Sequence, residues 1–393
     1  MSTNTIQTAL GRAIRPAFAL DPDWLTVSHG AYGATPCAVL AVQDAWRARM
    51  EAQPTFFMKR ILPGALRKAA SQLAVHFGAQ ACDLAFVENA TVGCNAVLHS
   101  LRFSEGDEIL LFDQGYRAVR NAAQHVAARS GARVAMVSIP WPDPDEDEIV
   151  ARLAAGLTGR TRLVILDHVT SPSALILPVA RLVALCRAAG VPVLVDGAHA
   201  PGQMCLDLAA LDADYYVGDG HKWLMAPRGS GFLWARRDRQ EGLHPLAISH
   251  PYGEGFTAEF DYTGTRDSTA YLAVPAALDF IEGLGGPALW RRNAVLARAG
   301  AEVLAGRFGT RIGGPACMSG SMASVRLPWR GAPTREASLA LRERLILQHQ
   351  TDAPVHPMGD GLWVRLSAQA YNELPDYEAL AERCLLACAE LEG

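Results

Sequence analysis

Short apolar runs alternate with longer amphipathic stretches from about residue 83 onward. This alternation is typical of βαβ units and of a mostly parallel sheet. Several runs, such as LVILD and VPVLVD, are apolar at consecutive positions, as expected of strands covered by helices on both faces. The predicted strands are Asp83 to Glu88, Glu108 to Asp113, Arg133 to Ile139, Arg162 to Asp167, Pro192 to Asp196, Asp214 to Gly218 and Ser230 to Ala235.

The stretches between these strands have helical spacing, and after Pro287 the pattern changes to a long helix, strand-like runs (SMASVRLPW, GLWVRLS) and a final helix from Asp376. We therefore predict an α/β protein with an N-terminal arm over 1–20, a large domain with a seven-stranded sheet over 21–285 and a smaller α+β domain over 286–393. The Gly-rich LGGP at 284–287 is the expected junction. The predicted helices of the large domain are Ala90 to Leu101, Tyr116 to Arg129, Glu146 to Leu157 and Pro178 to Ala189.

Composition narrows the class of protein. The 393 residues are 50% apolar and 19% charged, and no apolar stretch is long enough to cross a bilayer. With a net charge of -4 and no Lys/Arg block, a nucleic-acid partner is not expected. The segment MSTNTIQTALGRAIRPAF lacks the order of a secretory signal, so we expect a cytoplasmic location and no membrane partner.

The eight cysteines, at 37, 82, 94, 186, 205, 317, 384 and 388, form no C-x-x-C pair and no metal-ligand spacing. We expect most of them to be small core residues with reduced thiols, and we expect no metal site.

Polar residues that follow predicted strands are the candidates for chemistry, because ligands of an open parallel sheet bind beyond the carboxyl ends of its strands. Four segments qualify: ENAT at 88–91, DHVTSPS at 167–173, DGAHA at 196–200 and GDGHKW at 218–223.

Lys222 lies in an apolar setting, where a lysine can form a Schiff base with a carbonyl cofactor, although a surface lysine is the alternative. Asp196 ends an apolar strand, so a buried cation should face it, and the protonated ring nitrogen of pyridoxal 5'-phosphate (PLP) would serve. A Mg²⁺ ligand or a ribose-binding acid is also open for Asp196. No phosphate-binding loop of nucleotide enzymes occurs, and His199 and His221 lack zinc-site spacing.

Ala90 and Thr91 lie between a predicted strand and a helix start. Their backbone N–H groups, the Thr91 hydroxyl and the helix dipole would suit a phosphate. An ordinary threonine N-cap is an equal alternative from this segment alone.

Taken together, V-D-G-A-H-A, G-H-K-W and G-T-R-D resemble the class V aminotransferase group of fold-type I PLP-dependent enzymes over nearly the whole chain. The nearest subgroup resembles isopenicillin N epimerase. Its pattern is echoed in SHGAYGATP, FVENATVGCNAV, GDEILLFDQGY, TRLVILDHVTSPSALILPV, ADYYVGDGHKWLMAPRGSGFLW, DYTGTRD and LWVRLSAQAYN.

The resemblance implies a PLP cofactor and assigns residues to its ring. Lys222 is the lysine that carries the cofactor and removes the substrate's Cα proton, and Asp196 pairs with the pyridine nitrogen. His199 lies near the ring hydroxyl oxygen, and Tyr116 stands where relatives stack an aromatic or histidine ring.

For the phosphate, the resemblance implies Ala90, Thr91 and His221, with Thr265 reaching in from a neighbouring subunit of a homodimer that shares its active sites. Asp219 departs from the pattern, because relatives place a small polar residue there and a carboxylate would repel the phosphate unless it is protonated, turned away or paired.

For an amino-acid substrate, the resemblance implies that Arg365 grips the carboxylate, a task suited to its planar fork. A surface arginine on a strand is the alternative. His29 and Ser171 are further substrate-binding candidates, and Arg266 would bind a distal carboxylate or brace the phosphate.

Three reactions remain open, since PLP assists the breaking of any bond at Cα. They are epimerisation, placed first on the resemblance, β-elimination from a cysteine conjugate, and transamination. Epimerisation needs a second acid, for which Tyr116, His29, Tyr32 or a water are candidates. No cysteine occurs between Cys317 and Cys384, where related desulfurases carry their nucleophile, so a cysteine desulfurase is not expected. A PLP- or nucleotide-binding module without turnover is the non-enzymatic alternative.

Overall fold

The computed structural model describes residues 10–392, so residues 1–9 of the expected N-terminal arm, and residue 393, lie outside that range. In this part of the chain, the larger sheet has seven strands in the order β1-β7-β6-β5-β4-β2-β3. Strand β7 is antiparallel to both neighbours, and the other four pairings are parallel. The prediction of a mostly parallel seven-stranded sheet is confirmed.

Each strand begins and ends within two residues of its predicted bounds. The strands are β1 (Leu84–Val87), β2 (Glu108–Phe112), β3 (Arg133–Val137), β4 (Thr161–Asp167), β5 (Val193–Asp196), β6 (Tyr215–Asp219) and β7 (Gly231–Ala235). Consecutive apolar residues are used on opposite faces: Val193 and Val195 join one core cluster, and Leu194 joins the other. The uninterrupted apolar runs are therefore explained by burial on both faces.

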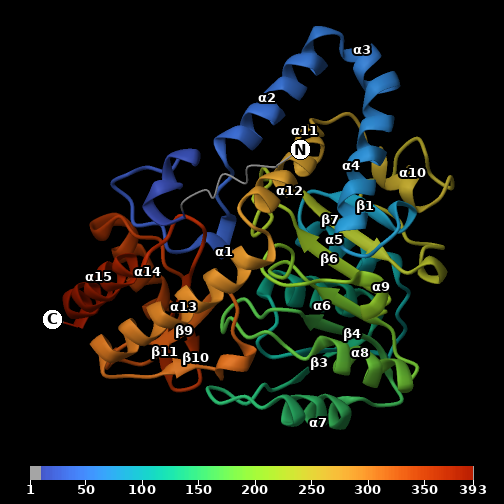
Figure 1. The fold of residues 1–393 in the computed structure, drawn as a ribbon. Coiled ribbons are helices and arrows are strands. Elements are labelled where there is room, and N and C mark those ends of the chain that lie inside the picture. Colours follow the sequence, from blue (N-terminus) through green and yellow to red (C-terminus); the bar gives the residue numbers. More distant parts are fainter. Residues whose placement is uncertain (1–9, 393) are drawn as a thin grey trace.

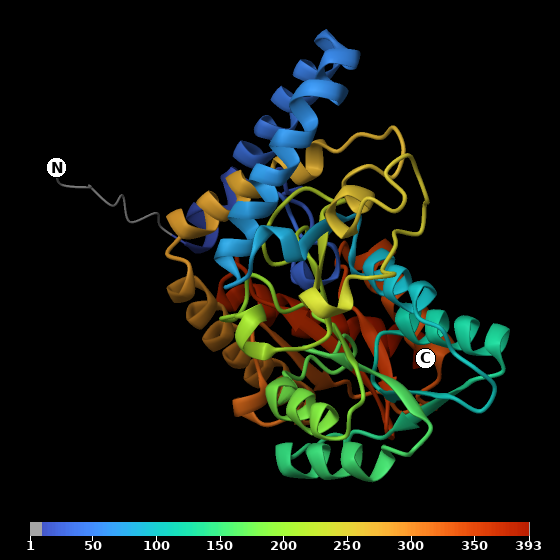
Figure 2. The ribbon, with the colours of Figure 1, turned by 90° about the vertical axis from the view of Figure 1, so that its right-hand side faces the viewer.

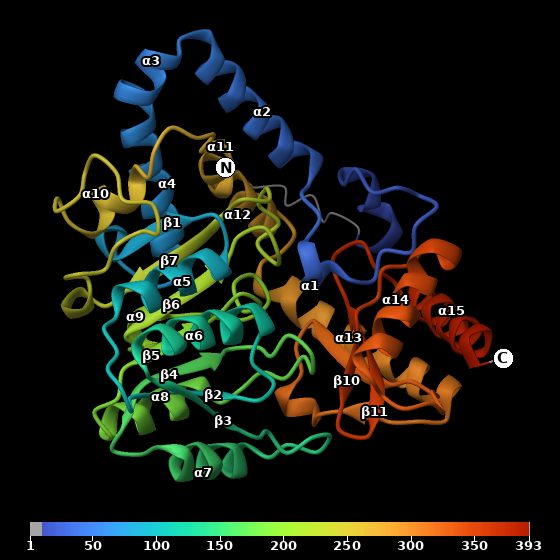
Figure 3. The same cartoon turned by 180° about the vertical axis from the view of Figure 1, so that it is seen from behind.

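Helices cover both faces of this sheet (Figure 1). One face is covered by α5 (Ala90–Ser100), α6 (Arg117–Ser130) and α10 (Phe256–Asp261). Figure 3 shows α5 and α6 lying across it. The other face is covered by α4 (Leu62–His76), α7 (Glu146–Gly156), α8 (Val179–Ala188), α9 (Leu208–Leu211), α11 (Thr269–Leu272) and α12 (Val274–Gly283).

A helical excursion precedes the sheet, and the sequence pattern did not reveal it. Helix α2 (Cys37–Ala52) leads away from the body, α3 (Pro54–Phe56) turns the chain and α4 returns it, as Figure 1 and Figure 2 show. A short helix, α1 (His29–Tyr32), comes before them.

The C-terminal elements form a second sheet with its own core (Figure 3). Its antiparallel strands are ordered β10-β11-β9-β8, with β8 (Ile312–Gly313), β9 (Met322–Arg326), β10 (Val355–Met358) and β11 (Gly361–Ser367). The helices are α13 (Pro287–Phe308), α14 (Arg335–His349) and α15 (Leu374–Glu392). Val27 also packs in this core, although the sequence assigned it to the large domain.

The cysteines divide evenly between interior and surface. Cys94, Cys186, Cys384 and Cys388 are buried, the other four are exposed, and all eight are free. The expectation that most are core residues is therefore wrong, because composition alone does not say which face of an element a cysteine occupies.

Across residues 10–392, no single helix is long and apolar enough to span a membrane. Only Thr269–Gly283 and Pro287–Phe308 taken together, bent by 72°, pass that test of length and composition. The same residues contain no group of three or more His, Cys, Asp or Glu side chains arranged to hold a metal ion.

Candidate active site

The ends of β4, β5 and β6 bring three carboxylates to one edge of the sheet. Asp167 and Asp196 are paired in register on neighbouring parallel strands, and Asp219 ends the next strand. All three are buried. A concentration of buried acids at the carboxyl edge of a parallel sheet marks a site that must bind or neutralise charge.

Asp196 is 3% exposed, and its Oδ1 accepts one hydrogen bond, from the Ala198 backbone N–H at 3.0 Å. Burial raises the pKa of Asp196 to about 6, against the opposing effects of the Ala198 N–H and of Lys222. A carboxylate with so few partners in the interior calls for a cation. A protonated pyridine nitrogen meets that need.

Asp167 was not given a role from the sequence, although it ends LVILD as Asp196 ends VPVLVD. Burial and then the charge of Asp196 raise the pKa of Asp167 well above its usual range. Its Oδ1 accepts the Tyr116 backbone N–H at 3.1 Å. Burial and the neighbouring charge of Asp196 therefore both favour the protonated form of Asp167.

Lys222 lies in a tight turn after β6 and is 9% exposed. Its Nζ lies 3.0 Å from Asp219 Oδ2. Backbone bonds close the turn, from Met225 N–H to Lys222 O at 3.0 Å and from Ala226 N–H to Gly220 O at 3.0 Å. The alternative of a surface lysine is therefore wrong: the amine is held inside the site by a buried carboxylate.

The bonds of Asp219 explain how a carboxylate is tolerated at a position where the family pattern has a small polar residue. Besides Lys222, it binds the Ala90 backbone N–H through Oδ1 at 2.7 Å. His221 Nδ1 lies 3.8 Å from the same oxygen and 3.4 Å from Ser230 O, and burial lowers the pKa of His221. A carboxylate at this position was expected to be protonated, turned away or paired, and the structure shows that Asp219 is paired with Lys222.

The start of α5 lies against this carboxylate. Asn89 caps the helix, its side chain accepting the Val92 N–H at 3.0 Å, so the alternative of a Thr91 N-cap is wrong. Thr91 is the second residue of the helix. Its hydroxyl is therefore not used for capping. The Ala90 N–H is bonded to Asp219 and the Val92 N–H to Asn89, so the Thr91 N–H and hydroxyl, with the dipole of the helix, are what the first turn offers to an anion.

His29 is held on both ring nitrogens. Nδ1 lies 2.9 Å from the Tyr371 hydroxyl and Nε2 lies 3.0 Å from Lys222 O. Burial lowers the pKa of His29 to about 4, so the ring is neutral. His29 therefore braces the backbone of Lys222. Sequence reasoning missed Tyr371, and its place in LWVRLSAQAYN was the available signal.

The chain passes very close to the lysine at Gly33. A Cβ on Gly33 would lie 1.8 Å from His221 O, and the residue has φ 71°, so only glycine allows this approach.

Among residues 10–392, eleven buried side-chain nitrogen and oxygen atoms have no hydrogen-bond partner, and two of them, His199 Nδ1 and Arg365 Nε, belong to predicted site residues. Burial, then Lys222, lowers the pKa of His199 well below its usual range, and burial lowers the pKa of Arg365 to about 10. Arg365 is 3% exposed on β11, and its Nη1 binds Ser171 through the backbone carbonyl and, at 3.2 Å, through Oγ. The alternative of a surface arginine is wrong. An unsatisfied buried donor or acceptor calls for an explanation, and at these two predicted site residues a bound ligand would supply one.

The remaining predicted residues are less buried than Lys222 and Asp196. Tyr116 is 41% exposed at the start of α6, and burial, then Asp196, raises the pKa of its hydroxyl. Thr265 is exposed. Arg266 pairs with Glu88 and lies over the Tyr271 ring at 5.1 Å, so neither contact joins it to Lys222 or Asp196.

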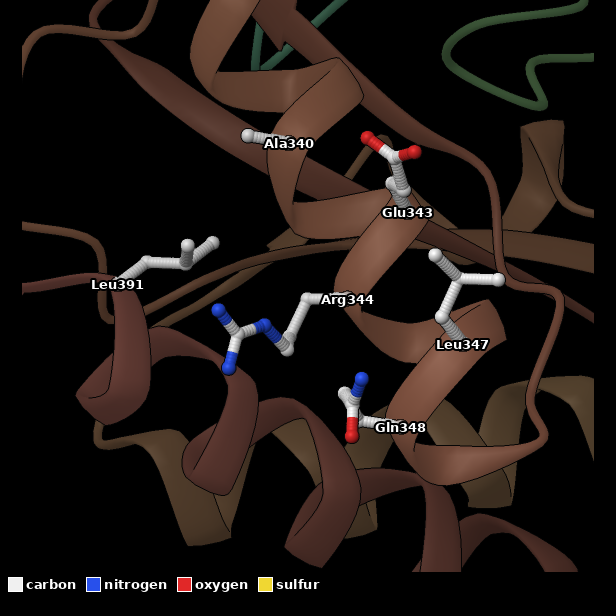
Figure 4. A pocket seen from close by; sticks show the side chains of 6 residues that line it. All are labelled: Ala340, Glu343, Arg344, Leu347, Gln348 and Leu391. Carbon is white, nitrogen blue, oxygen red and sulfur yellow. The ribbon is translucent and has the colours of Figure 1, made fainter.

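A separate hollow on the outer surface joins α14 and α15 (Figure 4). Of its two charged residues, Glu343 and Arg344, the arginine is paired with Glu390 at 3.1 Å. The lining residues are Ala340, Glu343, Arg344, Leu347, Gln348 and Leu391. None of Asp167, Asp196, Asp219 and Lys222 lines this hollow.

The sheet, the C-terminal domain and this site define a fold-type I enzyme. The aminotransferase class-V family matches residues 58–380, and the chain belongs to it. It is 38% identical to isopenicillin N epimerase of Amycolatopsis lactamdurans over 94% of this chain and 96% of that protein. It is 32% identical to a probable chloroplastic L-cysteine desulfhydrase of Arabidopsis thaliana over 92% and 82% of the two chains.

Among solved structures, the fold is similar to a C-DES variant with glycine covalently linked to its PLP cofactor. The TM-score is 0.80 at 22% identity, covering 94% of this chain and 98% of that one.

Proposed function

We propose that this protein is a PLP-dependent enzyme that removes the Cα proton of an amino acid. The observation that supports it is that the buried Lys222 amine and the buried Asp196 carboxylate lie at the same edge of the sheet, close enough for the charge of Lys222 to lower the pKa of Asp196. When bound, PLP delocalises the electrons left at Cα when a bond there breaks.

The chain's own residues would then divide the work. Lys222 would carry the cofactor, and its amine, when free, would accept the Cα proton at Nζ. Asp196 would pair with the protonated ring nitrogen, and His199, whose Nδ1 has no partner, would face the ring oxygen. Asp167, whose protonated form burial favours, would in that form add no second negative charge beside Asp196.

Binding of the remaining groups follows the same geometry. Thr91 and His221 would hold the phosphate at the start of α5, with Thr265 of a second copy, and Ala90 would join them once its N–H is released from Asp219. The exposure of Thr265 is compatible with a homodimer that shares its sites. Arg365, braced by Ser171, presents its unpartnered Nε edge to the substrate carboxylate.

We place epimerisation at Cα first. In its favour is the 38% identity to isopenicillin N epimerase over nearly the full length of both chains. A second acid is required on the other face of the ring. Tyr116 can supply it, because its raised pKa keeps the phenol protonated at neutral pH. His29 is a poor candidate, since both of its nitrogens are bonded.

β-Elimination from a cysteine or cysteine conjugate is the second candidate. It needs Lys222 as base and a leaving group, but no second acid. The 32% identity to a protein named as an L-cysteine desulfhydrase favours it further. Transamination is the third outcome.

The cofactor is tested directly. The purified protein should be yellow, and borohydride should attach the cofactor irreversibly to Lys222, as read by peptide mass. Lys222→Ala should bind no cofactor covalently and lose turnover, whereas Lys68→Ala, an exchange on α4 away from the site, should behave as wild type. A colourless protein that turns over no amino acid would refute the proposal.

The reaction is tested by incubating candidate amino acids in D₂O. Deuterium at Cα with mixed chirality supports epimerisation. Pyruvate with a released thiol supports elimination, and a stoichiometric keto acid supports transamination.

A further inference from the structure

A cleft of about 1000 Å³ opens beside the site, between the two domains. Its inner end includes Tyr116 and Ser171, and Ser171 is the residue bonded to Arg365. One wall comes from α6 and the end of β3, and the other from α14 and β10. A substrate whose carboxylate is held by Arg365 would therefore have room for a long side chain here, more than a free cysteine needs.

This cleft is cationic in a protein of net charge -4. Four arginines line it, and the only acid is Asp113. Both oxygens of Asp113 are already engaged, Oδ1 by the Ile139 N–H at 3.0 Å and Oδ2 by the Ser138 hydroxyl at 2.7 Å. The lining arginines are Arg117, Arg120, Arg335 and Arg342.

Most of this positive charge is uncompensated. Arg342 pairs with Asp352 at 2.8 Å. Within residues 10–392, no carboxylate oxygen comes within 4.0 Å of the guanidinium groups of Arg117, Arg120 or Arg335. Of these three side chains in the described part of the chain, only that of Arg120 donates a hydrogen bond, to a backbone carbonyl at 3.5 Å. Burial lowers the pKa of the lining His356 to about 3, so it adds no charge.

The N-termini of two helices add to the positive electrostatic potential of the cleft. Arg117 is the first residue of the 14-residue α6, and Arg335 is the first residue of the 15-residue α14. Both line the cleft. Helix N-termini carry partial positive charge, so their dipoles and the arginine side chains favour the same kind of ligand, an oxyanion.

We propose that this cleft binds an oxyanion at the far end of the substrate's side chain, so that the substrate is an extended amino acid ending in a carboxylate or a phosphoryl group. The inference rests on the proposed function and holds for epimerisation and elimination alike, because both begin with loss of the Cα proton. Arg117 and Arg335 are the specificity-determining residues.

The test compares substrates that differ only at the far end. S-(2-carboxyethyl)cysteine and its neutral amide, S-(2-carbamoylethyl)cysteine, are incubated with the holoenzyme in D₂O, and loss of the Cα–H signal is followed by NMR. Because this signal disappears in all three reactions, the readout does not depend on which one occurs. S-(2-phosphonoethyl)cysteine, as a third substrate, distinguishes a phosphoryl from a carboxylate preference.

We expect kcat/KM to favour a charged substrate over the amide by about ten-fold or more, mainly through KM, as one charge-assisted hydrogen bond would. The ratio should fall toward one in Arg117→Gln and Arg335→Gln and should shrink with added salt. The control Arg129→Gln alters an exposed arginine on α6 outside the cleft and should keep the wild-type ratio. A ratio taken within one variant is independent of how much of it folds.

The possible results distinguish a failure of the cleft assignment from a failure of the proposed function. Turnover of all three compounds at similar kcat/KM overturns the cleft assignment and leaves the proposed function standing. Wild-type ratios in Arg117→Gln and Arg335→Gln overturn it as well. No Cα–H loss from any amino acid, including free cysteine and alanine, overturns both.

Discussion

Replacing Asp196 with asparagine should change how the stability of the cofactor-free protein depends on pH. The pKa of Asp196 is raised from 3.8 to about 6 by burial, so the folded chain binds this proton more tightly than the unfolded chain. Stability is therefore highest below the unfolded pKa and falls as pH rises through the folded one. The raised pKa corresponds to about 3 kcal/mol in all, of which roughly half is lost between pH 5 and pH 8.

The asparagine keeps the shape and can still accept the Ala198 N–H, but it carries no charge. The variant should therefore lose less stability than wild type between pH 5 and pH 8. Removing the charge at position 196 also lowers the pKa of Asp167, which further weakens the dependence of stability on pH. Burial raises the pKa of Asp261 to about 6 as well, but that residue contributes equally to both proteins.

The measurement is urea unfolding of cofactor-free wild type and Asp196→Asn at pH 5 and pH 8. In wild type loaded with cofactor, a cation beside Asp196 should remove the loss, whereas the loaded variant should bind the cofactor more weakly. Equal pH dependence of cofactor-free wild type and variant would refute the argument that Asp196 is an uncompensated buried acid.

Three further predictions concern neighbouring residues. Asp219→Asn keeps an acceptor for the Ala90 N–H but removes a charge near the phosphate, so PLP affinity should rise by about ten-fold in absorbance titrations, and weaker binding would contradict this. Arg365→Lys loses the planar fork and should raise the substrate KM by roughly ten-fold or more with little change in cofactor spectrum. Tyr371→Phe leaves His29 Nδ1 without its partner and should lower the free energy of unfolding by about 1–3 kcal/mol, measured with urea, whereas Tyr252→Phe at the exposed surface should not.

Much of the large domain was predictable because its strands are buried on both faces. A strand such as Val193–Asp196 must be apolar at every position, and the polar residue that ends it then stands out. The same contrast marked Lys222 and Asp196. It also marked Asp167. That Asp167 lies beside Asp196 could not be predicted, because the sequence of a strand does not specify its register with the neighbouring strand.

The excursion formed by α2, α3 and α4 shows the opposite case. Only two residues of α2, Val39 and Gln43, are buried, so its sequence lacks a strong apolar face. A helix that packs little leaves a weak periodic signal.

From the sequence alone came the order along the chain of the seven strands and of helices α5 to α8, and the residue types that chemistry requires, because both depend on local patterns of apolar and polar positions. Only the tertiary structure decided the bonding of His29 to Tyr371, which is 342 residues away, the pairing of Asp219 with Lys222 and the start of α5, and the meeting of Arg117 with Arg335 across one cleft. Burial, pKa and charge compensation depend on what surrounds a group in space, and segments far apart in the chain supply those surroundings.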